Sequence, residues 1–200
     1  MSNPSDIWIT RWNDDVDKYH ASIFYDDFGQ KPKIDEKCLK AIPLESEDVP
    51  EYLFLKKDRP VRPPLKEVYT IMGGVPIIRR DLKEILERFD LGNTRFFPRE
   101  ILKADRKTVF SDEYFVVSIA ETKNLGVIEG SDVKVFPPGF VSLDYAERIF
   151  VRREDPPTTD MWLDEGFKYV GVLFSDRLYQ AIKAAGFKKL KFRKTFAPSG

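Results

Sequence analysis

The sequence predicts an α+β fold: a mainly antiparallel sheet with two amphipathic helices and an irregular N-terminal third. Runs of β-branched and aromatic residues with the length of strands recur along the 200-residue chain. Two stretches place apolar residues at the spacing of one helix face. Each stretch lies between two strand-like runs, which gives two strand-helix-strand motifs at 76–98 and 171–193. Helices that cover a face of an antiparallel sheet bury both apolar surfaces, so this pattern defines the fold class.

The N-terminal part, residues 1–70, is predicted to be rich in strands and loops. Residues 7–9 and 21–25 are short apolar runs separated by an acidic turn, and they predict a hairpin or meander. Within residues 30–64, only 52–55 has the composition of a strand. Regular helix is not expected in this segment because proline interrupts it repeatedly. These prolines are Pro32, Pro43, Pro50, Pro60, Pro63 and Pro64.

The first motif begins with a short strand at 76–78. The helix that follows has one apolar face, with charged residues on the other side. Residues 91–93, with Gly92 in the middle, end the helix, and residues 95–98 resume as a strand. The apolar face consists of Leu82, Ile85, Leu86 and Phe89.

The middle of the chain is predicted to be rich in strands. Residues 114–119, 140–143 and 148–151 have the composition of strands. Residues 144–147 separate the last two and fit a hairpin connection. We therefore expect 140–143 to pair with 148–151.

The second motif begins with a strand at 171–174. Ser175 fits the N-cap of the following helix, Gly186 fits its end, and residues 190–192 form the last strand. Each apolar residue of this helix lies ninety-six residues after its counterpart in the first motif. The constant offset indicates either an ancient duplication or a recurrent packing solution. The four residues are Leu178, Ala181, Ile182 and Ala185.

The chain is predicted to be a single domain, residues 1–200, with its core at 71–200. Hydrophobic residues make up 42% of the chain and charged residues 33%, which is enough for a packed core and a polar surface. Chains divide into separate cores only beyond roughly 250 residues.

The single histidine, His20, and the single cysteine, Cys38, exclude several classes of site. They cannot form an intramolecular disulfide, a Cys₄ or Cys₂His₂ zinc site, or a mechanism with two histidines. We interpret His20 as a surface or structural residue and Cys38 as a small buried or half-buried one. The acidic run at 14–17 lacks the glycine and the glutamate of a calcium loop. No enzyme, cofactor or metal site is therefore predicted.

The charge of the chain is balanced overall but uneven along its length. The 33 basic and 33 acidic residues cancel, yet residues 1–51 hold twelve acidic and six basic side chains. Residues 177–200 hold seven basic side chains and no acidic one. One interpretation is that the two ends attract one another in the fold or simply face solvent. The other is that one end presents a charged face to a partner.

The expected location is the cytoplasm. Residues 1–6 lack the basic and apolar regions of a signal peptide. The apolar runs are shorter than the ~18–20 residues that a membrane span needs. A single thiol also fits a reducing compartment. We expect no association with membranes.

The second half of the chain resembles a known family through short motifs. The most specific one combines Val172-Leu173-Phe174-Ser175-Asp176 with Ala185-Gly186-Phe187 and ends at Phe192. Within residues 70–193, these motifs resemble the eleventh immunity-protein family of bacterial polymorphic toxin systems. The resemblance implies a stoichiometric inhibitor that binds a cognate toxin, encoded by the adjacent gene, and blocks its active site or substrate path. The other motifs lie at 78–86, 97–98, 114–117 and 149–152.

Inhibition by binding needs aromatic anchors and complementary charge. The acidic N-terminal third offers both, and such a face suits a toxin with a basic cleft that binds nucleic acid. The alternative is that Trp8 and Trp12 are core or strand-surface residues. The candidate toxin-binding residues are Trp8, Trp12, Tyr25, Asp26 and Asp27.

Two other functions remain open. A carbohydrate-active or other small-molecule enzyme would use carboxylates, and a convergent acid pair in a deep cleft would favour it. A regulatory module that binds nucleic acid would use the basic segment 188–194, which also fits an edge strand with outward lysines. The neutral total charge and the lack of a known nucleic-acid-binding motif argue against a nucleic-acid partner.

Overall fold

The computed structural model describes residues 5–10, 23–24, 34–55, 67–70, 75–136, 140–142, 148–154, 158–167, 171–187 and 190–198. The chain divides into two compact units. The terminal unit comprises Met1–Arg11, Leu86–Asn93 and Ala120–Gly200, and the central unit comprises Trp12–Ile85 and Thr94–Ile119. Each unit has its own main sheet, and antiparallel pairs dominate in both, which confirms the predicted α+β class.

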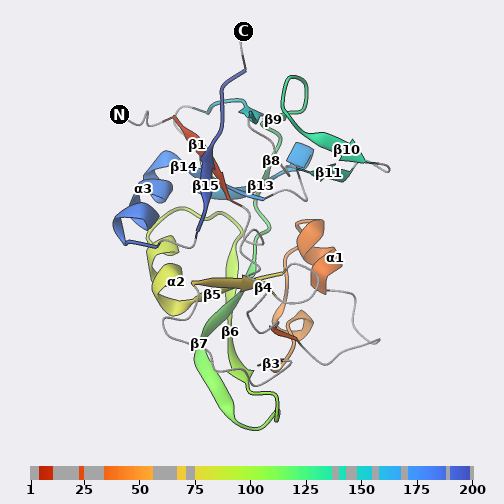
Figure 1. Ribbon diagram of the computed structural model, residues 1–200, viewed down its shortest axis with the longest axis vertical. Coiled ribbons are helices and arrows are strands. Elements are labelled where there is room, and N and C mark those ends of the chain that lie inside the picture. Colours follow the sequence, from red (N-terminus) through yellow and green to blue (C-terminus); the bar gives the residue numbers. More distant parts are fainter. Residues whose placement is uncertain are drawn as a thin grey trace. The chain divides into compact units, whose positions relative to one another are not determined.

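The central unit is built on a six-stranded sheet with the order β2-β3-β6-β7-β5-β4 (Figure 1). Its neighbouring strands are antiparallel except β3 and β6, which run parallel. The hairpin of β6 and β7 forms the middle, and its register shifts between Arg99 and Ile101. The strands are β2 (Ile23–Phe24), β3 (Leu53–Leu55), β4 (Val68–Thr70), β5 (Pro76–Arg79), β6 (Arg95–Leu102) and β7 (Val109–Ser118).

One face of this sheet carries the core of the central unit. Tyr114 and Val116, two residues apart on β7, are fully buried in the same apolar cluster. Ile77 of β5 and Leu53 of β3 belong to this cluster, as does Leu44 from the segment before β3. Full burial of an aliphatic side chain stabilises a fold by about 1.5–3 kcal/mol, so the cluster fixes which face of the sheet points inward.

Helix α1 (Ile34–Leu39) corrects the expectation that the proline-rich segment holds no regular helix. In the sequence Pro32 precedes this helix and Pro43 follows it, so neither ring removes a hydrogen bond within it. Its apolar side contacts the core through Ile34 and Cys38, which are four residues apart and share one face. The prolines therefore delimit the helix and do not prevent it.

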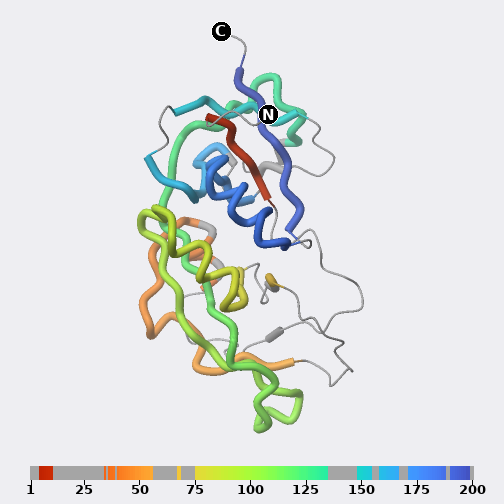
Figure 2. Tube along the Cα trace, turned by 90° about the vertical axis from the view of Figure 1, so that its left-hand side faces the viewer, coloured from red at the N-terminus to blue at the C-terminus, as the bar shows by residue number. Residues whose placement is uncertain are grey.

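The terminal unit is built on a five-stranded sheet with the order β15-β1-β14-β13-β8. β13 and β8 are parallel, and the other neighbours are antiparallel. Helix α3 (Asp176–Ala184) lies along β1 and β14 (Figure 2). Two further pairs, β9 with β12 and β10 with β11, belong to this unit. The strands are β1 (Ile7–Thr10), β8 (Thr122–Lys123), β9 (Gly126–Val127), β10 (Lys134–Phe136), β11 (Phe140–Ser142), β12 (Phe150–Val151), β13 (Met161–Asp164), β14 (Val172–Ser175) and β15 (Phe192–Lys194).

Both predicted hairpins are wrong, because in each case the strands pair with other partners. β1 lies between β14 and β15, whereas β2 pairs with β3 in the other sheet. β11 pairs with β10, and β12 pairs with β9. Ile7 and Ile9 of β1 are buried in one cluster with Leu173 of β14, so the apolar face of β1 selects a strand far away in the sequence.

Both predicted strand-helix-strand motifs form, and they share a topology. In the first, β5 and β6 flank β7 and are joined by helix α2 (Arg80–Leu86). In the second, β14 and β15 flank β1 and are joined by α3. Each is a split β-α-β arrangement, in which an antiparallel strand separates the two parallel ones. The registers agree at the offset of ninety-six: Ile77 and Phe97 pair with Val116, and Leu173 and Arg193 pair with Ile9.

Candidate functional site

Among the predicted toxin-binding residues, the structure describes Trp8. Its ring stacks on Tyr179 of α3, with ring centroids 3.7 Å apart and an interplanar angle of 17°. Its indole Nε1 donates a 2.9 Å hydrogen bond to the Asp176 carboxylate. These contacts give Trp8 a structural role in the terminal unit, and its contact with a toxin stays a prediction. The remaining candidates, which lie outside the described residues, are Trp12, Tyr25, Asp26 and Asp27.

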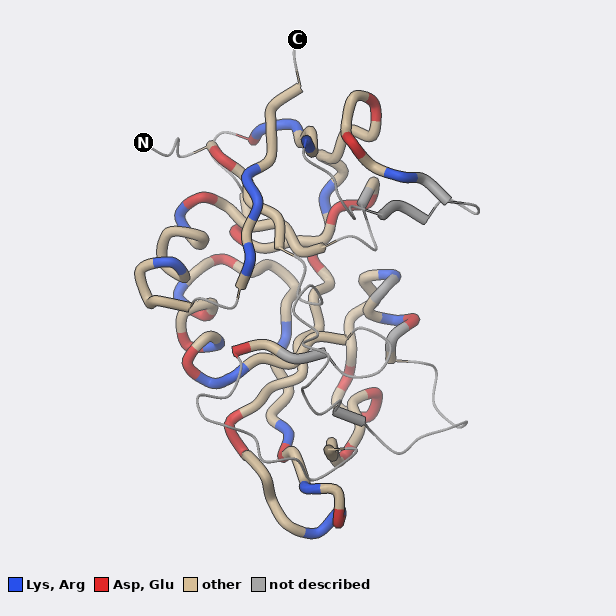
Figure 3. The backbone as a smooth tube through the Cα atoms, in the orientation of Figure 1, with Lys and Arg blue, Asp and Glu red and all other residues tan. Residues whose placement is uncertain are grey.

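One ion pair joins the two ends of the chain inside the terminal unit. The basic residues of β15 lie beside β1 (Figure 3), and Lys194 Nζ is 2.6 Å from Asp6 Oδ2. The Thr195 hydroxyl donates a 2.8 Å hydrogen bond to the carbonyl oxygen of Ile7. The two ends therefore attract one another at Asp6, whereas the described acidic residues Glu36, Glu45 and Asp48 form ion pairs within the central unit. β15 is also an edge strand of its sheet, as predicted for the basic segment.

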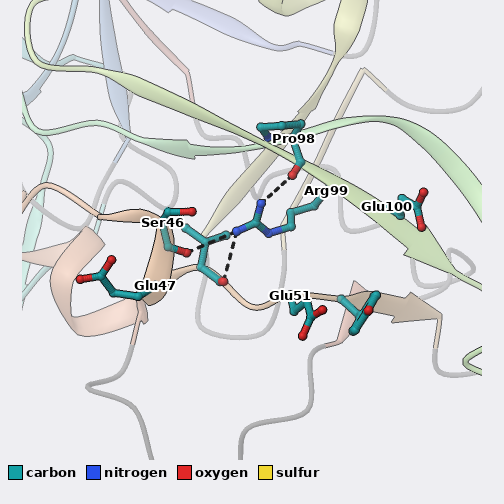
Figure 4. A pocket seen from close by; sticks show the side chains of 8 residues that line it. Ser46, Glu47, Glu51, Pro98, Arg99 and Glu100 are labelled. Carbon is teal, nitrogen blue, oxygen red and sulfur yellow. Dashed lines mark hydrogen bonds between the residues drawn. The ribbon is translucent and has the colours of Figure 1, made fainter.

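A pocket in the central unit is the strongest candidate site among the described residues. It has a volume of about 450 Å³ and lies where the short helix η1 (Ser46–Asp48) and the approach to β3 meet β6 (Figure 4). Eight residues line it: Ser46, Glu47, Val49, Glu51, Tyr52, Pro98, Arg99 and Glu100.

A capping box fixes the wall that η1 contributes. The Asp48 carboxylate accepts a 2.8 Å hydrogen bond from the Glu45 N–H, and the Asp48 N–H donates to the Glu45 carbonyl oxygen at 3.0 Å. The first bond is the one that the N3 side chain makes in a capping box, and the second is the main-chain bond of the 3₁₀ turn. Asp48 is itself buried and forms a 2.5 Å ion pair with Lys37 of α1. The wall is therefore formed before any partner arrives.

Arg99 joins this wall to β6. Its Nε donates to the Pro50 carbonyl oxygen at 2.6 Å, and its Nη1 donates to the Pro98 carbonyl oxygen at 2.7 Å. Its Nη2 lies 3.4 Å from the Ser46 carbonyl oxygen and 3.3 Å from that of Val49. Burial lowers the pKa of the Arg99 guanidinium. Its donors are directed at the main chain, so this cation holds the pocket together.

The rim of the pocket is acidic and aromatic. Figure 4 shows the carboxylates of Glu47, Glu51 and Glu100 on three sides of Arg99, and all three side chains are exposed. The Tyr52 side chain is 52% exposed, and a hydrogen bond to the Glu51 carboxylate raises the pKa of its hydroxyl. Carboxylates and an exposed ring form a surface that attracts cations.

The sequence matches one known protein family over most of its length. The sequence matches the family model described as Immunity protein family (Imm11) over residues 9–197. The chain belongs to this immunity-protein family. The predicted resemblance is confirmed, and the match to the immunity family starts near residue 9, whereas the motifs began near residue 70. No curated protein matches the sequence.

The described residues do not form a metal site. Within the described ranges, His, Cys, Asp and Glu side chains do not gather in groups of three or more that could hold a metal ion. The described helices are too short or too polar to cross a membrane. Cys38 is half-buried against the core, as predicted, and His20 lies outside the described residues.

The pocket of this immunity-family chain was not predicted from the sequence. One signal was present, because residues 45–51 are an acidic run within the acidic first quarter. The wall that β6 contributes gave no such signal. It is brought beside β3 by parallel pairing between residues more than forty positions apart, such as Leu53 and Ile101. A bulge then redirects the backbone around Glu100, which a residue pattern does not reveal.

Proposed function

We propose that this protein binds a cognate toxin domain in a one-to-one complex and neutralises it by covering its active site or substrate path. The observation that carries the proposal is the immunity-family match over residues 9–197, which spans nearly the whole chain. We further propose that it acts in the cytoplasm of the bacterium that makes the toxin, and that the adjacent gene encodes the toxin.

The proposed mechanism is occlusion without catalysis. A protein inhibitor needs a surface whose shape is fixed before binding, because ordering a flexible surface reduces the affinity. The capping box of Glu45 and Asp48 and the main-chain contacts of Arg99 supply such a surface in the central unit. The pocket carboxylates surround Arg99, and this arrangement does not favour the acid pair of a glycosidase.

Co-expression tests the protective role. The C-terminal domain of the protein encoded beside this gene is induced in a bacterial host with and without the present chain. We expect growth to stop with the domain alone and to continue when both are made. The complex is expected to elute as a single species containing one copy of each. Growth arrest that the chain does not relieve contradicts the proposal.

Titration separates a stoichiometric inhibitor from an enzyme that modifies the toxin. Increasing amounts of the chain are added to a fixed amount of the purified toxin domain, and the remaining toxin activity is measured. Occlusion predicts a linear loss of activity that ends at one equivalent. Complete inhibition by a small fraction of an equivalent, increasing with time, would indicate catalysis and overturn the proposed mechanism.

A further inference from the structure

The pocket at η1 and β6 has properties that say which part of a toxin it fits. It is concave, at about 450 Å³, and its walls come from two segments that are fixed by backbone contacts. It is also accessible, because Glu47, Glu51 and Glu100 are exposed around it. A rigid hollow of this kind receives a projecting side chain with little loss of conformational freedom.

The charges in and around the pocket differ in what they contact. The Arg99 guanidinium is partly buried, and its hydrogen bonds run to the carbonyl oxygens of Ser46, Val49, Pro50 and Pro98. The three glutamates face solvent. The pocket therefore has three exposed negative charges and one positive charge, whose donors are bound to the main chain. A partner that approaches from solvent therefore meets negative potential, which attracts a basic group and repels a phosphate.

Tyr52 adds a contact that specifies the kind of basic group. Tyr52 is 52% exposed, and its hydroxyl is close enough to the neighbouring Glu51 carboxylate for its pKa to be raised. An aromatic face next to a carboxylate binds a guanidinium or ammonium group by cation–π contact and by a charge-assisted hydrogen bond together. Tyrosine is also enriched among the residues that dominate the energy of protein interfaces.

We propose that this pocket receives an arginine or lysine side chain of the toxin domain, held by Tyr52 and by the Glu47, Glu51 and Glu100 carboxylates. The inference rests on the proposed immunity function and names the chemistry of the contact. The occupant is a basic segment of a protein, since the same rim disfavours a nucleic acid. Attraction between the rim and the toxin raises the association rate, and the ion pairs lengthen the lifetime of the complex.

Charge reversal in the pocket tests the inference. The probe is the purified toxin domain encoded by the adjacent gene, and binding is followed by surface plasmon resonance at several salt concentrations. The variant combines Glu47→Lys, Glu51→Lys and Glu100→Lys. We expect Kd to rise by at least about tenfold, mainly through slower association, with a weaker dependence on salt. Tyr52→Ala is expected to weaken binding further, and Tyr52→Phe to weaken it less, because it keeps the ring.

A matched control carries the same change in net charge outside the pocket. It combines Glu84→Lys, Glu129→Lys and Glu165→Lys, all at exposed positions. Thermal unfolding confirms that both triple variants fold. Equal losses in the two variants would show a general charge effect and overturn the inference, as would unchanged affinity in the pocket variant. In both cases the wild-type chain still binds, so the proposed function stands. A wild-type chain that fails to bind and to protect overturns both.

Discussion

The two split β-α-β motifs have the same backbone arrangement and different chemistry at equivalent positions. In the central unit, the Lys83 ammonium lies over two rings, 4.9 Å from the centroid of Phe115 and 5.6 Å from that of Phe96. The equivalent of Lys83 in the terminal unit is Tyr179, ninety-six residues later. Its ring stacks on Trp8 and meets Phe192 edge-on at 5.1 Å. A three-ring cluster thus replaces a cation between two rings.

The starts of the two helices differ in a similar way. Ser175 caps α3, and its hydroxyl accepts from the Leu178 N–H and donates to Asp160. The equivalent position before α2 is Arg79, which pairs with Asp81. Asp160 also pairs with Arg177 of α3, so an ion pair lies at the start of both helices. The pairs differ in which partner is buried: Asp160 is 0% exposed and Arg177 60%, whereas Arg79 is 19% exposed and Asp81 46%.

The middle strands of the two motifs, β7 and β1, also differ in their distance along the sequence from the strands with which they pair. β7 follows β6 through a short turn, so the first motif closes locally. β1 comes from the beginning of the chain and is inserted between β14 and β15, more than 150 residues later. The same split β-α-β arrangement therefore forms whether its middle strand is a neighbour in sequence or comes from the other end of the chain. Distant closure is slower, because a long loop must be closed before its contacts form.

The largest effect is expected from the buried Asp160 carboxylate of the terminal unit. Asp160→Ala removes the acceptor of Arg177, of the Ser175 hydroxyl and of the Asp90 N–H. The Ser175 hydroxyl is buried and loses its acceptor, while Arg177 is exposed and can turn to water, so we expect the free energy of unfolding to fall by about 2–3 kcal/mol. Asp81→Ala removes a partly exposed pair and is expected to cost at most about 1 kcal/mol. Urea unfolding of both variants measures the difference, and equal losses would contradict this ordering.

A smaller effect is expected from the residues that lie on the aromatic rings. Tyr179→Ala removes the stack on Trp8 and the edge contact with Phe192, and we expect a loss of about 2 kcal/mol. Lys83→Ala removes a cation–π contact and is expected to cost about 0.5–1 kcal/mol. Tyr179→Phe keeps the ring and serves as the control. Urea unfolding followed by circular dichroism measures both losses, and a larger loss for Lys83→Ala than for Tyr179→Ala would contradict this ordering.

Residue patterns predicted the features that depend on local sequence. The first turns of the predicted helix faces formed, with Leu82, Leu86, Leu178 and Ile182 buried, as did the Ser175 cap, because spacing and capping act within a few residues. The predicted end of the first helix at 91–93 is wrong, because α2 ends at Leu86 and leaves Phe89 outside it. Helix α1 was missed because prolines near both of its ends were read as excluding helix. The family resemblance followed from the same local motifs around residues 172–192, and the match over residues 9–197 confirms it.

Pairing between distant strands was not predictable from local patterns. The insertion of β1 between β14 and β15 depends on a shared core of Ile7, Ile9 and Leu173. A run such as 7–9 shows that a strand forms but does not show its neighbour. The pocket depends on the same kind of information, because Arg99 reaches carbonyl groups about fifty residues earlier in the chain.

The smallest effect on stability is expected in the turn that connects β6 to β7 in the first motif. The Asp105 carboxylate accepts hydrogen bonds from the Thr108 hydroxyl at 2.6 Å and from the Thr108 and Lys107 N–H groups at 2.9 Å. The Thr108 hydroxyl is the largest cause that lowers the pKa of Asp105 to about 2. A lowered pKa in the fold means that the charged carboxylate stabilises the turn above its unfolded pKa of about 3.9. This contribution is lost as the pH falls through about 2.

Titration of the Asp105 carboxyl by NMR tests this local closure. The wild-type midpoint is expected at about pH 2. Thr108→Val keeps the shape of the side chain but removes the hydroxyl donor, so the midpoint is expected to rise toward 3.9. Thr108→Ser keeps the donor and should leave the midpoint near the wild-type value. A valine variant with an unchanged midpoint would show that the backbone N–H groups alone hold the turn, so the local closure of β7 would not depend on this side chain.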